Sequence, residues 1–255
     1  MILFDTHTHI YSKEFDEDRK EALKRSFDLG VTQLLLPNID LESIEPMHKL
    51  CDEYPDNCFP MMGLHPTSVN ADYKTVLQTI RKELDNRKYV AIGEIGIDLY
   101  WDKTFAKEQR IVLLEQLQWA IDFDLPVVIH SRRSHNEIME VIKEFNNPEL
   151  RGVFHCFTGS TQQAEEIIDI NFKMGLGGVL TFKNAGIANE IRDIDIKHFI
   201  LETDSPYLTP TPYRGKRNES SYIEIIAKKL AEVKGMSLEE VAAKTTENAR
   251  SLFGL

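Results

Sequence analysis

The sequence predicts an α/β fold, a single (β/α)8 TIM-type barrel that spans residues 1–255, and three observations support this. The length of 255 residues is close to the ~250 typical of one such barrel. Short apolar or β-branched runs alternate with longer helical patterns from end to end, which favours a parallel sheet. No linker divides the chain, and no glycine-rich phosphate loop follows the first run, so a closed barrel is favoured over an open dinucleotide-binding sheet.

The apolar runs place eight strands in order along the chain. We expect them at residues 2–5, 33–36, 58–64, 89–95, 126–129, 152–154, 172–176 and 199–202. Helical spacing of apolar residues is clearest between them at 105–124. Residues 220–253 predict two further helices that break at Gly235, and Ser237 with Glu240 three residues later has the pattern of a capping box.

Composition and charge narrow the class of protein. The chain is 42% hydrophobic and 28% charged, which is typical of a folded globular protein. No apolar run approaches the ~20 residues of a membrane span, and Cys51, Cys58 and Cys156 form no CxxC pair. We therefore expect a cytoplasmic protein with the cysteines as core residues, no membrane association and no obligate protein partner. The net charge of -11 disfavours a non-specific grip on duplex nucleic acid, unless positive charge gathers at one mouth.

Residues able to bind metal follow five of the expected strands. His7 and His9 follow the first strand, and the two-residue period of a strand directs both rings to one side. The carboxyl ends of barrel strands converge on one face. A single histidine there is more often a satisfied buried residue, but six clustered imidazoles and carboxylates are costly to bury unless a metal neutralises them. The sequence predicts a metal site formed by His7, His9, Glu94, His130, His155 and Asp204.

The motifs around these residues resemble those of the TatD-type metal-dependent deoxyribonucleases, a branch of the amidohydrolase-like barrels. The resemblance spans nearly the whole chain, and the motifs in this order are highly specific. They are Asp5-Thr6-His7-Thr8-His9, Gly63-Leu64-His65-Pro66, Gly93-Glu94-Ile95-Gly96-Ile97-Asp98, His130-Ser131-Arg132, His155-Cys156-Phe157-Thr158-Gly159, Leu201-Glu202-Thr203-Asp204-Ser205-Pro206-Tyr207-Leu208 and Arg214-Gly215-Lys216-Arg217-Asn218.

The resemblance implies a site for two divalent metal ions bridged by Glu94. One ion would be held by His7, His9, Glu94 and Asp204, and the other by Glu94, His130 and His155. A glutamate suits the bridge, since its two oxygens can span ions about 3.5 to 4 Å apart. The family implies Mg or Mn for activity, and the mixed nitrogen and oxygen donors also suit Zn, Ni or Co.

Further residues take roles from the same resemblance. Asp204 would be catalytic, accepting a proton from the attacking water, and His65 would donate to a substrate phosphate oxygen. Glu202 either orients a metal ligand or is an ion-paired carboxylate, and Asp98 either supports a ligand or caps the next turn. Asn218 would bond either phosphate or backbone.

Positive charge is expected at the mouth of the site. Arg214, Lys216 and Arg217 follow the eighth strand, and Arg132 and Arg133 follow His130. A basic cluster is usually only a solvated patch, but at the mouth of an acidic protein phosphate recognition is favoured. We interpret Arg214, Lys216 and Arg217 as substrate-binding.

These inferences converge on a divalent-metal nuclease that removes nucleotides from DNA ends or short single strands, with 3′–5′ polarity implied by the resemblance. A rival is an amide, ester or lactone hydrolase, because the same pair of metals can direct water to a carbonyl carbon. A third reading is a binding protein that has lost catalysis. The intact ligand set argues against the third, and the basic loop argues against the second.

Overall fold

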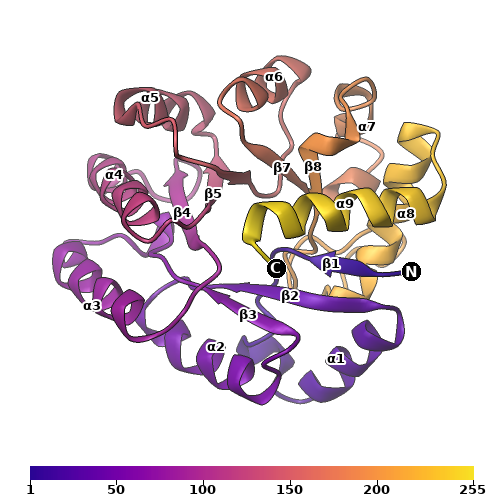
Figure 1. Ribbon diagram of the computed structural model, residues 1–255, viewed down its shortest axis with the longest axis horizontal. Helices are drawn as coiled ribbons and strands as arrows, with labels where there is room; N and C mark the ends of the chain where they lie inside the picture. The colour runs from indigo at the N-terminus through magenta and orange to yellow at the C-terminus, as the bar shows by residue number, and fades with distance from the viewer.

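Eight parallel strands surrounded by helices make up the computed structural model, which describes residues 1–255 (Figure 1). The strands are β1 (Leu3–Asp5), β2 (Val31–Pro37), β3 (Cys58–Met61), β4 (Ile92–Asp98), β5 (Val127–Arg132), β6 (Gly152–Phe154), β7 (Lys173–Leu176) and β8 (Phe199–Leu201). All eight expected strands are present, in the expected order.

The strands form two arcs that are joined at both seams. One arc has the order β1-β2-β3 and the other β4-β5-β6-β7-β8, all with parallel pairing. An isolated parallel bridge pairs Met62 with Ile92 between the arcs, and a second pairs Thr8 with Ser205. At the second seam the Thr6 amide also donates to the carbonyl of Leu201 at 3.1 Å. These contacts complete the barrel that the sequence predicted.

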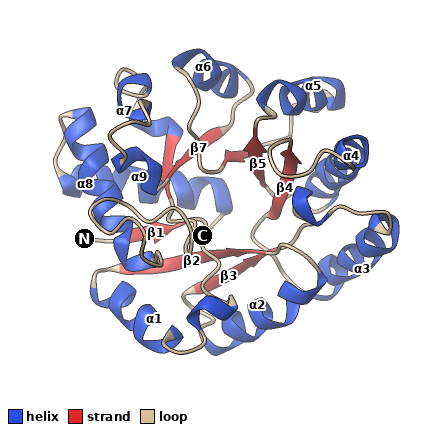
Figure 2. Ribbon diagram, turned by 180° about the vertical axis from the view of Figure 1, so that it is seen from behind, coloured by secondary structure: helices blue, strands red, loops and turns tan.

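Helices form the outer layer (Figures 1 and 2). They are α1 (Arg19–Asp28), α2 (Leu41–Glu53), α3 (Tyr73–Asn86), α4 (Ala106–Asp122), α5 (His135–Phe145), α6 (Thr161–Asp169), α7 (Ile187–Glu190), α8 (Ile223–Lys234) and α9 (Leu238–Phe253). Short 3-10 helices lie at Lys13–Phe15, Pro66–Ser68, Gly178–Thr181, Ile196–His198 and Ser220–Tyr222. The two predicted C-terminal helices are confirmed as α8 and α9, with Gly235 left-handed between them and the Ser237–Glu240 capping box formed.

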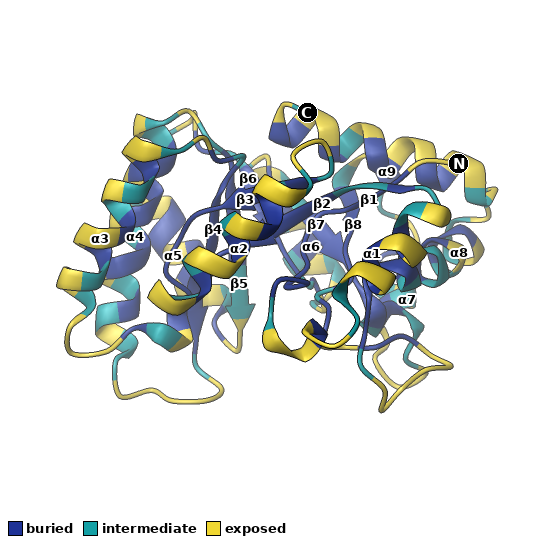
Figure 3. Ribbon diagram, turned by 90° about the horizontal axis from the view of Figure 1, so that it is seen from below, coloured by how far each residue is buried: buried dark blue, intermediate teal, exposed yellow.

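Helix α9 closes one end of the barrel. Its Ala249, Leu252 and Phe253 join a cluster of 10 buried residues that includes Phe4 of β1 and Ile200 of β8. A larger cluster of 55 buried residues fills the space between strands and helices. Figure 3 shows β5 pointing to the edge opposite the two chain termini, so the carboxyl ends of the strands face away from α9. The end of the barrel that α9 leaves uncovered, at the carboxyl ends of the strands, is where the predicted metal site would lie.

The fourth and fifth strands extend further than predicted. Strand β4 runs to Asp98 rather than ending near residue 95, because its pairing with β5 continues to Asp98 opposite Arg132. Gly96 lies in the strand, paired with His130 of β5. A Cβ there would be 2.0 Å from the carbonyl oxygen of His130. Consequently His130 lies within β5 rather than just beyond it, and Glu94 lies inside β4 as predicted.

The cysteines are all unpaired. Cys51 and Cys58 are buried in the larger core cluster, as predicted. For Cys156 the prediction of a core position was wrong. It lies just beyond β6 with a φ of 48°, and its amide donates to Glu202 Oε1 at 2.6 Å, so it belongs to the strand-end face. None of the helices is both long enough and apolar enough to cross a membrane.

Candidate metal centre

The six residues predicted as ligands come together around Glu94, a buried residue of β4. Glu94 Oε2 lies 3.1 Å from His7 Nε2 and 3.8 Å from His9 Nε2. The other oxygen, Oε1, lies 2.8 Å from His130 Nδ1 and 2.8 Å from His155 Nε2. The two carboxylate oxygens therefore face different pairs of histidines, as a bridging ligand would require.

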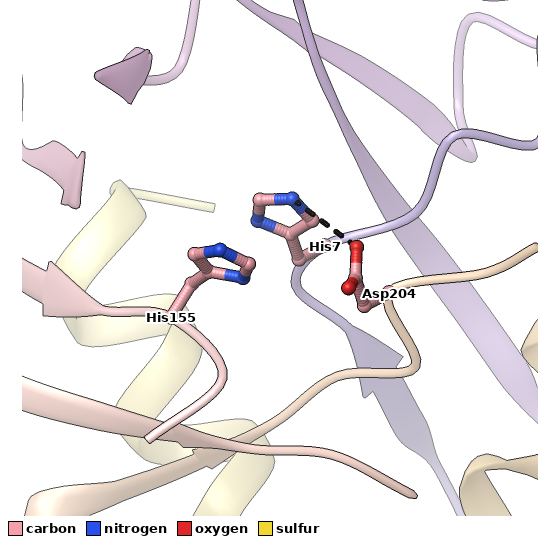
Figure 4. Close-up of side chains that lie close together, drawn as sticks. All are labelled: His7, His155 and Asp204. Atoms are coloured by element: carbon pink, nitrogen blue, oxygen red, sulfur yellow. Dashed lines mark ion pairs between the residues drawn. The ribbon is translucent and has the colours of Figure 1, made fainter. Parts of the chain in front are cut away.

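Asp204 completes the side of the cluster that contains His7 and His9. Its Oδ1 lies 3.8 Å from His7 Nε2 and 3.6 Å from His9 Nε2. Figure 4 shows His7, His155 and Asp204 directed toward one another from the ends of three strands. The His7 and His155 rings stack, with centroids 4.0 Å apart. Asp204 has a φ of 54°, a left-handed conformation that non-glycine residues seldom adopt outside functional or turn positions.

The donors lie close enough together to act as ligands, and those around Asp204 are not hydrogen-bonded to it. Three groups of them have ligand atoms within 4.8 Å of one another: His7, His155 and Asp204; His7, His9 and Glu94; and His65, Glu94 and His130. Gaps of 3.6 to 3.8 Å between nitrogen and oxygen are too long for hydrogen bonds. Ligands bonded to one ion at about 2.1 Å lie roughly 3 to 3.5 Å apart. His7 Nδ1 is also buried without a hydrogen-bond partner. The donor set fits divalent metal ions.

The electrostatics of the cluster favour a bound cation. Burial alone would raise the pKa of Glu94, but the neighbouring histidines, above all His155, hold that pKa well below its usual range. Burial would likewise raise the pKa of Asp204, yet His9, His155 and His7 lower it. Burial would lower the pKa of His155, but the adjacent carboxylates raise it well above its usual value. Both carboxylates are thus ionised, and their negative charge beside imidazole nitrogens suits a bound cation.

The comparisons with known proteins bear on this site. The family model described as TatD related DNase matches residues 4–254. The chain belongs to this family. It is 37% identical over 253 residues to YabD of Bacillus subtilis (strain 168), described as an uncharacterized metal-dependent hydrolase, with 99% of each protein covered. The 3'-5' ssDNA/RNA exonuclease TatD of Pantoea ananatis is 29% identical over 261 residues, covering 99% of this chain and 100% of that protein.

Solved structures agree with the fold. The crystal structure of YjjV, a TatD homologue from Escherichia coli K12, superposes with a TM-score of 0.93 at 30% identity, covering 99% of this chain and 98% of that one. A phosphotriesterase homology protein from Escherichia coli, solved with phosphate in its active site, gives a TM-score of 0.73 at 14% identity over 98% of each chain. The second likeness is one of fold alone. Both likenesses support the barrel fold.

His65 lies closer to the cluster than the sequence suggested. It was predicted to contact substrate, and its Nε2 lies 3.3 Å from Glu94 Oε1 and 3.2 Å from His130 Nδ1. Its Nδ1 lies 2.6 Å from Thr67 Oγ1, which fixes the ring. His65 is therefore close enough to Glu94 and His130 to be a further candidate ligand. The sequence predicted a strand over residues 58–64 that is followed by His65, whereas β3 ends at Met61 and the segment that follows it carries His65 to the cluster.

Asp98 fills both of the roles considered for it. Its Oδ2 lies 2.9 Å from His130 Nε2, and its Oδ1 accepts from the amides of Tyr100 at 2.8 Å and Trp101 at 3.1 Å. Burial would raise the pKa of Asp98, but the hydrogen bonds from His130 and these amides lower it to about 2. One carboxylate therefore orients a metal-site histidine and also fixes the following loop.

Glu202 contacts the residues at the end of β6, including His155. Its Oε1 accepts from the Cys156 amide and lies 3.4 Å from His155 Nδ1. The backbone makes room for this carboxylate, since a Cβ on Gly175 would lie 2.1 Å from Glu202 Oε2. Glu202 is buried rather than solvated, and its contact with His155 fits both an ion pair and orientation of that ring.

Sequence reasoning missed two supporting residues. Tyr11 Oη lies 3.0 Å from His9 Nδ1 and donates to the carbonyl of Pro37, so it holds the ring of His9. Asp5 accepts hydrogen bonds from the amide and hydroxyl of Thr203, which ties β1 to the end of β8. Burial raises the pKa of Asp5 to about 7. Asp5 and Tyr11 continue the two-residue period of His7 and His9, and this period could have indicated that their side chains lie on the same side.

In the basic loop after β8, two cationic side chains form no ion pair and one does. Arg214 and Lys216 are exposed and form no ion pair; Arg214 lies 3.7 Å from the centre of the Phe182 ring. Arg217 is ion-paired, because its guanidinium donates to both oxygens of Asp18 at 2.6 and 2.8 Å. This favours a structural role for Arg217, and Arg214 and Lys216 remain the candidates for binding phosphate.

Of the two partners predicted for Asn218, phosphate or backbone, the structure shows the backbone. Its buried amide donates to the carbonyls of Thr203 at 2.8 Å and Tyr207 at 2.6 Å. It therefore holds the loop against the end of β8, on either side of Asp204.

A polar cavity of about 350 Å³ adjoins the cluster. His155 lines it together with Arg133, His135, Thr158 and Gln163. Only 3 of its 13 lining residues are hydrophobic, so it suits a polar or charged ligand better than an apolar one.

Proposed function

We propose that the protein is a divalent-metal-dependent deoxyribonuclease of the 3′–5′ exonuclease type, which hydrolyses phosphodiester bonds at DNA ends or in short single strands. The observation that carries this proposal is the convergence of four histidines on the two oxygens of Glu94, with Asp204 beside two of them, His7 and His9. A relative with nearly full coverage, from Pantoea ananatis, is named as a 3'-5' ssDNA/RNA exonuclease.

Two metal ions account best for the donors. His7, His9, Glu94 and Asp204 would hold one ion, and Glu94, His130 and His155 the other, with Glu94 as the bridge. Bound divalent ions would lower the pKa of a water and offset the charge that develops on phosphate oxygens. Mg or Mn would support turnover, and the nitrogen donors also suit Zn, Ni or Co.

Asp204 would be the proton acceptor. Its Oδ1 is the oxygen nearest His7 and His9, which leaves Oδ2 to accept a proton from the attacking water. Its depressed pKa keeps it ionised and ready to accept. Asp98 and Glu202 would keep the rings of His130 and His155 in place during turnover, since each carboxylate contacts the ring nitrogen that points away from Glu94.

Substrate phosphates would meet the few free cations of the mouth. Arg214 and Lys216 form no ion pairs, and Arg133 lines the polar cavity beside His155. In a chain with a net charge of -11, such a local concentration of positive charge would direct an anionic substrate to this face. His65 would donate to a phosphate oxygen if it is not itself a ligand.

A substrate panel on metal-loaded protein tests the proposal. We expect stepwise shortening of an end-labelled single-stranded oligonucleotide with Mg or Mn, and loss of that activity with a chelator. Asp204→Asn, prepared in the same way, excludes a contaminating nuclease. If the protein left DNA and RNA intact but hydrolysed an amide, ester or lactone, it would be a carbonyl hydrolase. If it hydrolysed nothing while binding ligand, it would be an inactive binding protein.

A further inference from the structure

A group of exposed aromatic and cationic side chains lies beside the metal centre. Tyr100 and Trp101, in the loop between β4 and α4, are 42% and 68% exposed, and Trp101 is the most exposed of the large hydrophobic residues. Arg132 and Arg133, at the end of β5, are exposed too. We call these four residues the aromatic platform. Large aromatic side chains left in water at the mouth of a site indicate a binding surface.

The platform is fixed relative to the metal centre through Asp98. The amides of Tyr100 and Trp101 donate to Asp98 Oδ1, while Asp98 Oδ2 contacts His130 Nε2 at 2.9 Å. His130 in turn lies 2.8 Å from Glu94. Two side chains thus link the base of the loop to the bridging carboxylate. A ligand held on the platform would extend toward the metal site in a defined register.

The positive charges of the platform are unpaired with any carboxylate. The guanidinium carbon of Arg132 lies 4.1 Å from the centre of the Tyr100 ring and 5.0 Å from that of Trp101. That of Arg133 lies 4.8 Å from the Tyr100 ring. Neither arginine forms an ion pair, whereas Arg217 and Arg25 do. The platform therefore combines exposed aromatic surface with cations that are free to meet phosphates.

We infer that the aromatic platform binds an unpaired nucleobase of the substrate by stacking on Trp101, while Arg132 and Arg133 contact the adjoining phosphates. This inference rests on the proposed function and specifies its substrate class, because bases within a duplex are already stacked and paired. Aromatic side chains combined with basic groups are the common means of binding single strands without sequence preference. The platform would therefore favour single-stranded ends over blunt duplex ends.

Kinetics with matched oligonucleotides test the inference. For Trp101→Ala we expect the KM for a short oligothymidylate to rise about tenfold or more, the effect of losing one stacked base. Trp101→Phe keeps a ring and should restore most of the affinity. An oligomer of equal length with abasic terminal nucleotides supplies phosphates without bases, and its KM should not respond to Trp101→Ala. Ile111→Ala, which removes an exposed apolar side chain of α4, is the control and should leave both KM values unchanged.

Fluorescence gives a second readout that does not require turnover. The chain has two tryptophans, and Trp119 is only 4% exposed, so quenching by a bound base reports on Trp101. We expect saturable quenching by oligothymidylate and little by the abasic oligomer.

The outcomes separate this inference from the proposed function. If the wild type degrades DNA but Trp101→Ala has no effect, or affects both oligomers equally, stacking is overturned and the nuclease stands. If the wild type degrades no nucleic acid, the proposed function fails, and quenching decides the inference. Base-dependent quenching would then support stacking, and its absence would overturn it.

Discussion

Asp98→Asn should weaken metal binding without disturbing the barrel. Asp98 Oδ2 contacts His130 Nε2 at 2.9 Å, while Oδ1 accepts from two amides of the next loop. Asparagine offers one acceptor oxygen and one NH2 group. Whichever way the amide is oriented, either the ring of His130 or the loop loses its acceptor. The side chain that orients a metal ligand is typically worth 10- to 100-fold in metal affinity, or about 1.4 to 2.7 kcal/mol.

Competition between the protein and a chromophoric chelator for Zn or Mn measures this affinity. Asp102→Asn provides the matched control, because Asp102 is exposed and its carboxylate contacts only the amide of Thr104 in its own loop. We expect the metal affinity of Asp98→Asn to be 10- to 100-fold weaker and that of Asp102→Asn to be unchanged. Circular dichroism should show that both variants are folded. An affinity within twofold of the wild type in Asp98→Asn would refute the reasoning that Asp98 acts through His130.

Three further predictions concern proton transfer, phosphate binding and stability. Asp204→Asn should fold and bind metal but lose two or more orders of magnitude in kcat, and near-normal turnover at saturating metal would exclude Asp204 as the base. Replacing Arg214 and Lys216 with alanine should weaken single-strand binding and reduce its salt slope by about 0.7 per lost phosphate contact, measured by titration at several salt concentrations. An unchanged slope would count against that role. Arg217→Gln should leave the slope intact but lower the free energy of unfolding by up to about 1 kcal/mol at neutral pH. Hydrogen bonding to Arg217 lowers the pKa of Asp18 from 3.8 to about 2, so this stabilisation is present above about pH 4. It should fade as pH falls through that interval, and a stability difference that stayed constant down to pH 2 would contradict the assignment.

The sequence was sufficient to predict that the six candidate ligands lie together, because each belongs to a strand or follows one. The carboxyl ends of barrel strands converge, so His7, His130 and Asp204 could be expected together although they are distant in sequence. Strand boundaries were less certain. The fourth strand was expected to end at residue 95, but β4 continues to Asp98 because it pairs with β5 there.

Contacts between side chains that are distant in the sequence could not be predicted from the sequence. Arg217 looked like a phosphate ligand from its neighbours, yet its partner Asp18 is 199 residues away. His65 lies beyond the end of β3, and only the folded structure brings its ring to 3.3 Å from Glu94. Local patterns report periodicity, but they do not report which distant carboxylate a cation meets.

Anomalous diffraction from crystals of Mn- or Zn-loaded protein tests the central claim most directly, because it counts the ions and identifies their ligands. Our account predicts two anomalous peaks about 3.5 to 4 Å apart, with one oxygen of Glu94 bound to each. One peak should lie against His7, His9 and Asp204, and the other against His130 and His155. A single ion, or two ions of which neither contacts Glu94, would contradict it.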